Sequence, residues 1–367
     1  MDSKKGSLLL CPNKAPRESN LELFRIIVML LIIAHHYVVN SEVFALMRSD
    51  RIDAPAVFFN IFGAWGKTGI NCFVLITGYF MCTSRITLRK YMKLYLEIKF
   101  YQYAIWAVFL AFGMSSFSYK GFLLGLLPFS RIGNSFTNAF MAFYLFIPFL
   151  NLLVKSMKKR QHLLLIGILL WIYTILGMFK LTTYNYVSWF VVLFFVASYI
   201  RFYGLTHNDS TRFWGIMALL VLALSIVCIF IPTAFGKKPT YCSVSDSNAV
   251  FALLLSVSGF MFFKNLKMGH SKLINAIGST TFGVFLIHTR GEEMRQWLWY
   301  DFVDCGGHYY DKLFWLYAIG VVLSIFIVCS LIDWLRITCL EKWAFRKLDP
   351  LFVRIENKWK NTNNKNE

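Results

Sequence analysis

Charged side chains are scarce in this chain: they make up 16% of its 367 residues, and only 19 are acidic against 38 lysines and arginines. With 57% hydrophobic residues, so little charge excludes an ordinary soluble domain and is typical of a protein solvated by lipid. No DNA- or RNA-binding motif accompanies the net charge of +19, and anionic lipid headgroups account for basic loops without a nucleic acid. The scarcity of charge therefore indicates an integral membrane protein.

Metal-ligand patterns and sequence repeats are also lacking. The eight cysteines show no CxxC or Cys/His spacing suited to a metal, so we expect no metal site. Cys242 and Cys305 fall in loops predicted on the same side of the membrane. A disulfide between them is one alternative, and two free thiols are the expected state. Without internal repeats, heptads or low-complexity linkers, residues 21–335 are predicted to form one membrane domain between polar tails at 1–20 and 336–367.

Long hydrophobic runs are what the chain has in abundance. Ten of them approach the roughly 20 apolar residues that a helix needs to cross a bilayer. They lie at 21–40, 62–82, 98–114, 138–154, 162–179, 187–203, 213–232, 248–263, 276–289 and 313–333. The first run follows a polar tail and lacks a small-x-small cleavage site, so we expect it to remain as the first helix. The predicted fold is all-α, a polytopic membrane protein of about ten transmembrane helices.

The distribution of basic residues predicts the orientation of these helices. With ten spans and the N-terminus inside, the cytoplasmic loops and tails hold 26 Lys and Arg, and the opposite loops hold 10. Cytoplasmic loops are enriched in these residues. We therefore expect both termini in the cytoplasm.

Two ionisable residues, Arg25 and His36, lie within the first hydrophobic run. At 100° and 1.5 Å per residue, they fall within about 20° of one helix face and roughly 16 Å apart along the axis, whereas His35 points about 80° away. Intramembrane Arg and His usually face a bundle interior or a wet cavity, so a functional site is the default interpretation. The structural alternative is an Arg that reaches the membrane surface and a His held by a neighbouring hydroxyl.

Local patterns around these residues suggest structural roles. Ser19 and Glu22 fit a capping box at the start of the first helix, and Glu22 also stands three residues before Arg25 as an ion-pair partner. Small residues recur in the second run, at Gly63, Gly66, Gly69 and Gly78. They allow either another helix or a ligand to approach closely, and we favour helix packing.

The ionisable groups are distributed unevenly across the predicted membrane. Arg89, Lys90 and Lys93 form a basic cluster at the cytoplasmic face, which either holds phosphates or anchors the helix. His288 ends the ninth run, so it approaches the outer membrane half together with His36. A basic inner mouth suits an anionic cytosolic molecule, and histidines near the outer side suit proton transfer on an extracytoplasmic hydroxyl.

At these residues the chain resembles the membrane-bound acyltransferase family 3, which contains bacterial polysaccharide and peptidoglycan O-acetyltransferases. The Arg-x10-His pair is the family's signature, and it maps onto Arg25 and His36. The other segments that carry the resemblance are 20–25, 69–79, 144–151, 189–194 and 277–288. Together they cover most of the chain.

The resemblance implies transfer of an acetyl group from cytosolic acetyl-CoA to a hydroxyl of an extracytoplasmic or lipid-linked glycan, in the plasma (inner) membrane of a bacterial cell. His36 is then the general base, with an acetyl-His36 intermediate as the variant mechanism, and His288 is a second proton carrier or a hydrogen-bonding partner. Arg25 binds or orients the donor, and Arg89, Lys90 and Lys93 add charge at its entrance. Acetyl-CoA is a donor rather than a permanently bound cofactor. The acceptor, other acyl groups and the oligomeric state stay open.

Two other functions are compatible with the sequence. A transporter or flippase of a lipid-linked saccharide is the alternative, because buried ionisable groups also line transport paths. The lack of a recognisable inverted repeat counts modestly against it. A glycosyltransferase is the third option, and its acidic candidates, Glu292, Glu293, Asp301 and Asp304, lack a supporting motif.

Overall fold

The computed structural model describes residues 17–48, 52–130, 132–133, 135–205, 209–241 and 244–363. Within these ranges all regular structure is helical, and no strand occurs. A chain of this composition is expected to be helical, because helices satisfy their own backbone hydrogen bonds where water is absent. The predicted all-α polytopic fold is confirmed.

Six helical stretches of the described chain are long and apolar enough to cross a membrane. They are α1 (Ser19–Val39), α7 (Ser135–Ser156), Lys159–Met178, α10 (Tyr186–Tyr203), Thr211–Phe235, and Phe314–Lys358, which begins with α16 (Phe314–Leu335). The other predicted runs correspond to α4 (Gly66–Met81), α5 (Leu88–Ala111), α12 (Val250–Asn265) and the pair α13 (Lys272–Gly278) and α14 (Thr281–His288). Each of the ten runs therefore forms helix, while ten as the number of spans stays a prediction.

Shorter helices complete the chain between and beyond these elements. The stretch Lys159–Met178 consists of α8 (Lys159–Leu170), η1 (Trp171–Ile175) and α9 (Leu176–Met178), and Thr211–Phe235 consists of α11 (Thr211–Phe230) and η2 (Ile231–Phe235). The connecting helices are α2 (Val43–Leu46), α3 (Ala54–Phe62), α6 (Tyr119–Gly125), α15 (Gly291–Arg295) and η3 (Gln296–Phe302). After α16 the chain continues through η4 (Arg336–Glu341) into α17 (Lys342–Asn363).

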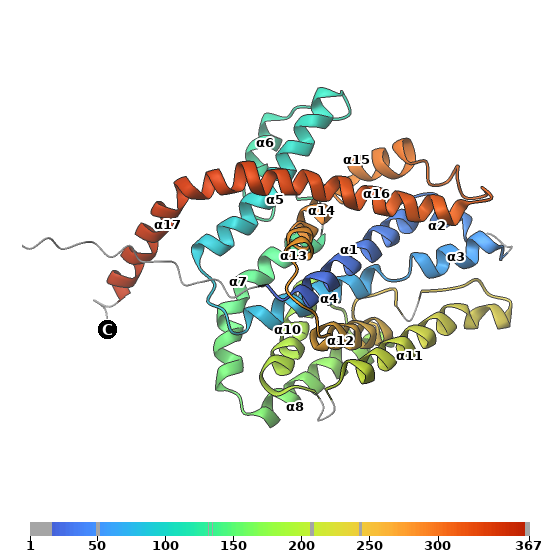
Figure 1. The fold of residues 1–367 in the computed structure, drawn as a ribbon, viewed down its shortest axis with the longest axis horizontal. Coiled ribbons are helices and arrows are strands. Elements are labelled where there is room, and N and C mark those ends of the chain that lie inside the picture. The colour runs from blue at the N-terminus through green and yellow to red at the C-terminus, as the bar shows by residue number, and fades with distance from the viewer. Residues whose placement is uncertain are drawn as a thin grey trace, which may run out of the picture.

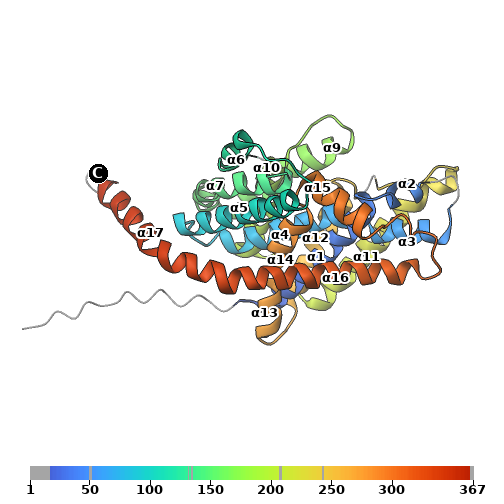
Figure 2. The same cartoon turned by 90° about the horizontal axis from the view of Figure 1, so that it is seen from above.

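Helix α1 lies in the middle of the molecule, in contact with α4, α12, α13, α14 and α16 (Figure 1). Helix α16 follows one side of the bundle, and α17 extends from it beyond the other helices (Figure 2). The end of α17 lies at the far left of the molecule in both views.

The ninth predicted run is broken into α13 and α14, which the hydrophobic pattern did not indicate. The hydroxyls of Ser279 and Thr280 donate to the carbonyls of Ala276 and Ile277 at the break. A Cβ at Gly278 would come within 2.4 Å of the Glu22 carboxylate, so α1 packs directly against the end of α13. The break thus lets a short helix carry His288 into the centre of the bundle.

Glycines bring α4 against α1. A Cβ at Gly63, Gly66 or Gly69 would come within 2.7 Å of a side chain of α1, and one at Gly78 within 2.9 Å of α10. The helix-packing interpretation of these glycines is confirmed.

The predicted capping box is wrong. Residue 18 is the N-cap of α1 and shows no side-chain cap bond. Ser19 instead donates to Asn275 Oδ1 at 3.0 Å and accepts the backbone N–H of Ser271 at 2.9 Å. Tertiary contacts with α13 therefore replace the local cap.

Candidate active site

His36 and His288 form a hydrogen-bonded pair in the centre of the protein. His36 lies on α1 and His288 ends α14, and their rings meet with His36 Nδ1 3.0 Å from His288 Nε2. His288 Nδ1 lies 2.7 Å from the carbonyl oxygen of Val284, which accepts only, so Nδ1 carries a proton. In neutral His288 the Nε2 atom is then an acceptor, and His36 donates its Nδ1–H to it. This leaves His36 Nε2 with a free lone pair, as a general base requires.

A cavity of about 130 Å³ lies beside this pair. Its polar lining consists of His35, His36, Lys67, Ser135 and Tyr186. Since a water molecule takes about 30 Å³ of liquid volume, the space holds roughly four waters or a small reacting group. We call it the histidine cavity.

His35 borders the same cavity, although helix geometry places it about 100° away from His36 around the axis. Its Nδ1 contacts the carbonyl oxygen of Gly63 at 2.5 Å, and the absence of a side chain at Gly66 lets α4 approach the ring. The two adjacent histidines therefore have different hydrogen-bond partners, but both face one cavity.

Lys67 is a site residue that the sequence reasoning missed. Its Nζ donates to the hydroxyl of Tyr186 at 2.8 Å, at the wall of the histidine cavity. The signal was present, because Lys67 is an ionisable residue within the predicted span 62–82. A cation held by a neutral phenol beside a base is suited to stabilise a developing negative charge.

Arg25 lies near the opposite end of α1, away from the histidines. Its Nη1 contacts Glu22 Oε1 at 3.1 Å, which agrees with the predicted i,i+3 pair, and Arg17 reaches the same oxygen at 3.4 Å. The side chain of Arg25 is 24% exposed. Arg25 and His36 therefore line two different depths of the protein rather than one contact site.

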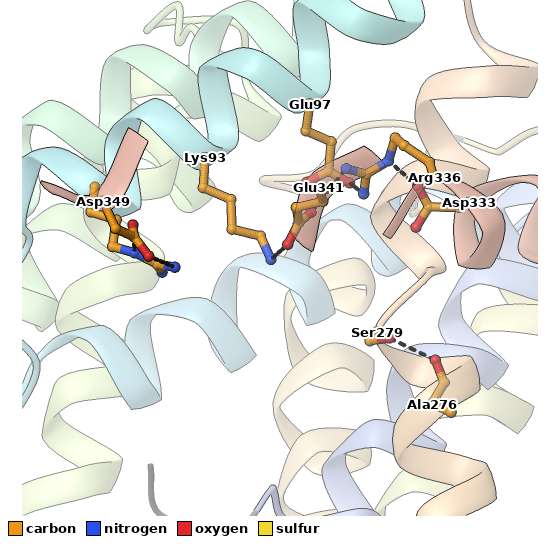
Figure 3. Close-up of polar contacts among 9 residues, drawn as sticks. Lys93, Glu97, Ala276, Ser279, Asp333, Arg336, Glu341 and Asp349 are labelled. Atoms are coloured by element: carbon orange, nitrogen blue, oxygen red, sulfur yellow. Dashed lines mark hydrogen bonds and ion pairs between the residues drawn. The ribbon is translucent and has the colours of Figure 1, made fainter. Parts of the chain in front are cut away.

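The basic cluster at the start of α5 is engaged with the C-terminal helices (Figure 3). Arg89 contacts Asp349 of α17 at 2.6 Å, and Lys93 forms an ion pair with Glu341 of η4. Lys90 donates to Ser84 Oγ and to a backbone carbonyl. An anionic donor that binds here must compete with these two carboxylates.

A second charged cluster, centred on Arg336, lies deeper between α5 and α16 (Figure 3). Arg336 contacts Asp333 at 2.6 Å and both Glu97 and Glu341 at 2.9 Å. The hydroxyl of Tyr101 donates to Asp333 at 2.6 Å. Asp333 also fills the space over Gly283, where a Cβ would come within 2.1 Å of its carboxyl carbon. This cluster fixes α14, and with it His288, against α5 and α16.

Metal ligands do not gather anywhere in the described chain: no group of three or more His, Cys, Asp or Glu is placed to hold an ion. Cys305 is a buried free thiol, and Cys242 lies outside the described residues.

Comparison with known proteins gives one finding. A family model for an acyltransferase domain, that of acyltransferase family 3, matches residues 18–334. No curated protein and no solved structure matches the chain. The matched region begins just before α1, ends within α16, and includes both histidines of the pair.

Proposed function

The chain belongs to the acyltransferase 3 family, and from this premise we propose that it transfers an acetyl group from cytosolic acetyl-CoA to a hydroxyl of an extracytoplasmic or lipid-linked glycan. The family match supports acyl transfer in general. The observation that carries the finer proposal is the His36–His288 pair beside a cavity that also contains Lys67. The base and the cation thus line one cavity, and the orienting group bonds to the base.

His36 acts as the general base in this proposal. Its free Nε2 takes the proton of the acceptor hydroxyl as the oxygen attacks the thioester carbonyl. The Nδ1–H bond to His288 orients the ring and stabilises the imidazolium that forms. His36 then returns the proton to the leaving thiolate, so that an ester and a thiol are the products. An acetyl group carried on His36 is the variant of the same chemistry.

Lys67 stabilises the oxyanion in this scheme. The negative charge develops on the former carbonyl oxygen, and a fixed cation that lines the same cavity stabilises that charge. Tyr186 holds the ammonium group in place.

The donor approaches from the cytoplasmic end of α1. Arg25 orients it, and Arg89, Lys90 and Lys93 attract its phosphates. Neutralising these three residues of α5 is expected to raise the apparent KM for acetyl-CoA, more at low salt than at high salt, because exposed charges are screened. If the triple variant inserted correctly and its KM for acetyl-CoA were unchanged, the cluster would have no role in binding the donor and would serve only to link α5 to the C-terminal helices.

The direct test uses membranes that contain the protein and acetyl-CoA labelled in the acetyl group. We expect the label to pass to a saccharide fraction, and His36→Ala to abolish most of this transfer at equal protein level. A flippase would show no transfer of label in either case.

A further inference from the structure

A large apolar groove lies on the other side of the histidine pair. It has a volume of about 690 Å³, which is within the size range of binding sites for small molecules. Its walls come from the second half of α5, from η3 and from α16, and include Ile105, Phe109, Trp297 and Val328. His288 lines the groove and also bonds to His36, so one residue separates the groove from the histidine cavity.

The inner end of this groove reaches the charged cluster around Arg336. Tyr101 and Ile332 line the groove there, and Tyr101 is bonded to Asp333 of that cluster. At the other end it includes Phe112 and Phe302, which are exposed to 74% and 71%. The groove is therefore open toward the end of α5.

A positively charged site adjoins the groove at Arg290, two residues after His288. Arg290 lines three small cavities next to α5, and one of them shares Ile105 and Phe109 with the groove. Arg290 Nε is buried without a hydrogen-bond partner among the described residues, and Glu293 is the carboxylate that attracts its charge. An anion is the chemistry that satisfies such a group.

Lys99 adds a second cation to this region. It is only 5% exposed, and its Nζ donates to neutral acceptors, namely Gln102 Oε1, Gly125 O and Ser130 O. Gln102 borders two of the small cavities at Arg290. The site thus has more positive charge than its own carboxylate compensates.

The start of α7 connects the Arg290 site to the histidines. Thr137 borders a small cavity at Arg290, and Ser135 borders the histidine cavity. The Arg290 site and the histidine cavity therefore both border the first turn of α7.

We propose that the acceptor is carried on a lipid phosphate, with its hydrocarbon chain in the groove and its phosphate at Arg290. This inference rests on the proposed acetyl transfer and specifies its acceptor class. A hydrocarbon chain gains no hydrophobic free energy when it moves from lipid into an apolar groove, so packing and charge must select it. The groove supplies the packing, and Arg290 and Lys99 supply the charge. The saccharide beyond the phosphate then reaches His36.

The test measures binding separately from catalysis. Purified full-length protein in detergent is titrated with a long-chain isoprenyl phosphate and with the uncharged isoprenol of the same chain, and binding is followed by native mass spectrometry. We expect the phosphate to bind at least about tenfold more tightly, and Arg290→Gln to remove that difference. Arg160→Gln on the exposed surface of α8 is the matched control.

Ala104→Trp tests the groove itself, because Ala104 lines it and the larger side chain fills it. This substitution is expected to weaken the binding of both ligands at least about tenfold. Ala107→Trp, on an exposed face of the same helix, is expected to change neither. The proposal would be overturned if isoprenyl phosphate and isoprenol bound equally well, or if Ala104→Trp changed the binding of neither. It would also be overturned if phosphatidylglycerol displaced bound isoprenyl phosphate as effectively as free isoprenyl phosphate does.

Acetyl transfer distinguishes the two proposals. Normal labelling of a water-soluble glycan by the Ala104→Trp protein would refute the lipid acceptor and leave the proposed transfer intact. Tight binding of isoprenyl phosphate without label transfer to any saccharide would refute the transfer alone.

Discussion

Replacement of the three central histidines is expected to lower kcat most at His36, less at His288 and least at His35. His36→Ala removes the proposed base, and a positioned base contributes about 10²–10⁴-fold to rate. We therefore expect a loss of that size in kcat, with the protein still inserted and present at normal level.

His288 is a positioning residue in this scheme, so its loss should cost less. His288→Leu leaves the buried Nδ1–H of His36 without its acceptor, which costs about 1–3 kcal/mol, or about 5- to 150-fold in kcat. His288→Gln offers an amide oxygen to the same N–H and should recover part of that loss. A role in packing alone would not distinguish Leu from Gln in this way.

His35→Gln is the internal control. A glutamine amide can still donate to the carbonyl of Gly63, so we expect less than about a tenfold loss. The assay is transfer of labelled acetyl in membranes, normalised to protein level, with kcat and KM separated. A greater loss at His35 than at His36, or full activity of His288→Leu, would refute the assignment of the base.

Three further outcomes are expected. Lys67→Met keeps the length of the side chain but removes its charge, so kcat should fall about 10²–10³-fold with little change in KM, as measured in the same transfer assay. Gly66→Ala places a Cβ 2.2 Å from the ring of His35 and should destabilise the protein by about 1–3 kcal/mol in thermal unfolding, whereas Gly167→Ala, which meets no atom within 4 Å, should not. Reporter fusions at the two ends of the chain should both report the cytoplasm, and an outside location of either end would contradict the orientation drawn from the basic loops.

The hydrophobic runs predicted the helices well, because a run near 20 apolar residues allows few other structures in lipid. The neighbouring pair of Glu22 and Arg25 was also predictable, since residues three apart meet on a helix. The break at Ser279 and Thr280 was not read from the hydrophobic pattern, although Gly278 and the two hydroxyl side chains are a local turn signal.

The site was predicted only in part. His36 and His288 were both placed in the outer half of the membrane, but their hydrogen bond joins residues 252 positions apart and follows from the tertiary fold alone. The approach of His35 to the same cavity depends on how closely α4 packs at Gly66. Lys67 carried a visible signal, since a lysine within an apolar run indicates a functional site.

The position of α1 has a consequence for synthesis. This helix is made before the other described helices, yet its partners at Phe263, Asn275 and His288 follow it by more than 240 residues. At about 5–20 residues per second, the roughly 250 intervening residues take on the order of 10–50 s to make. During that time Arg25 already has its neighbour Glu22, but His36 lacks its hydrogen-bond partner His288. The His36–His288 pair on which the proposed mechanism depends therefore forms only after α14 has been made.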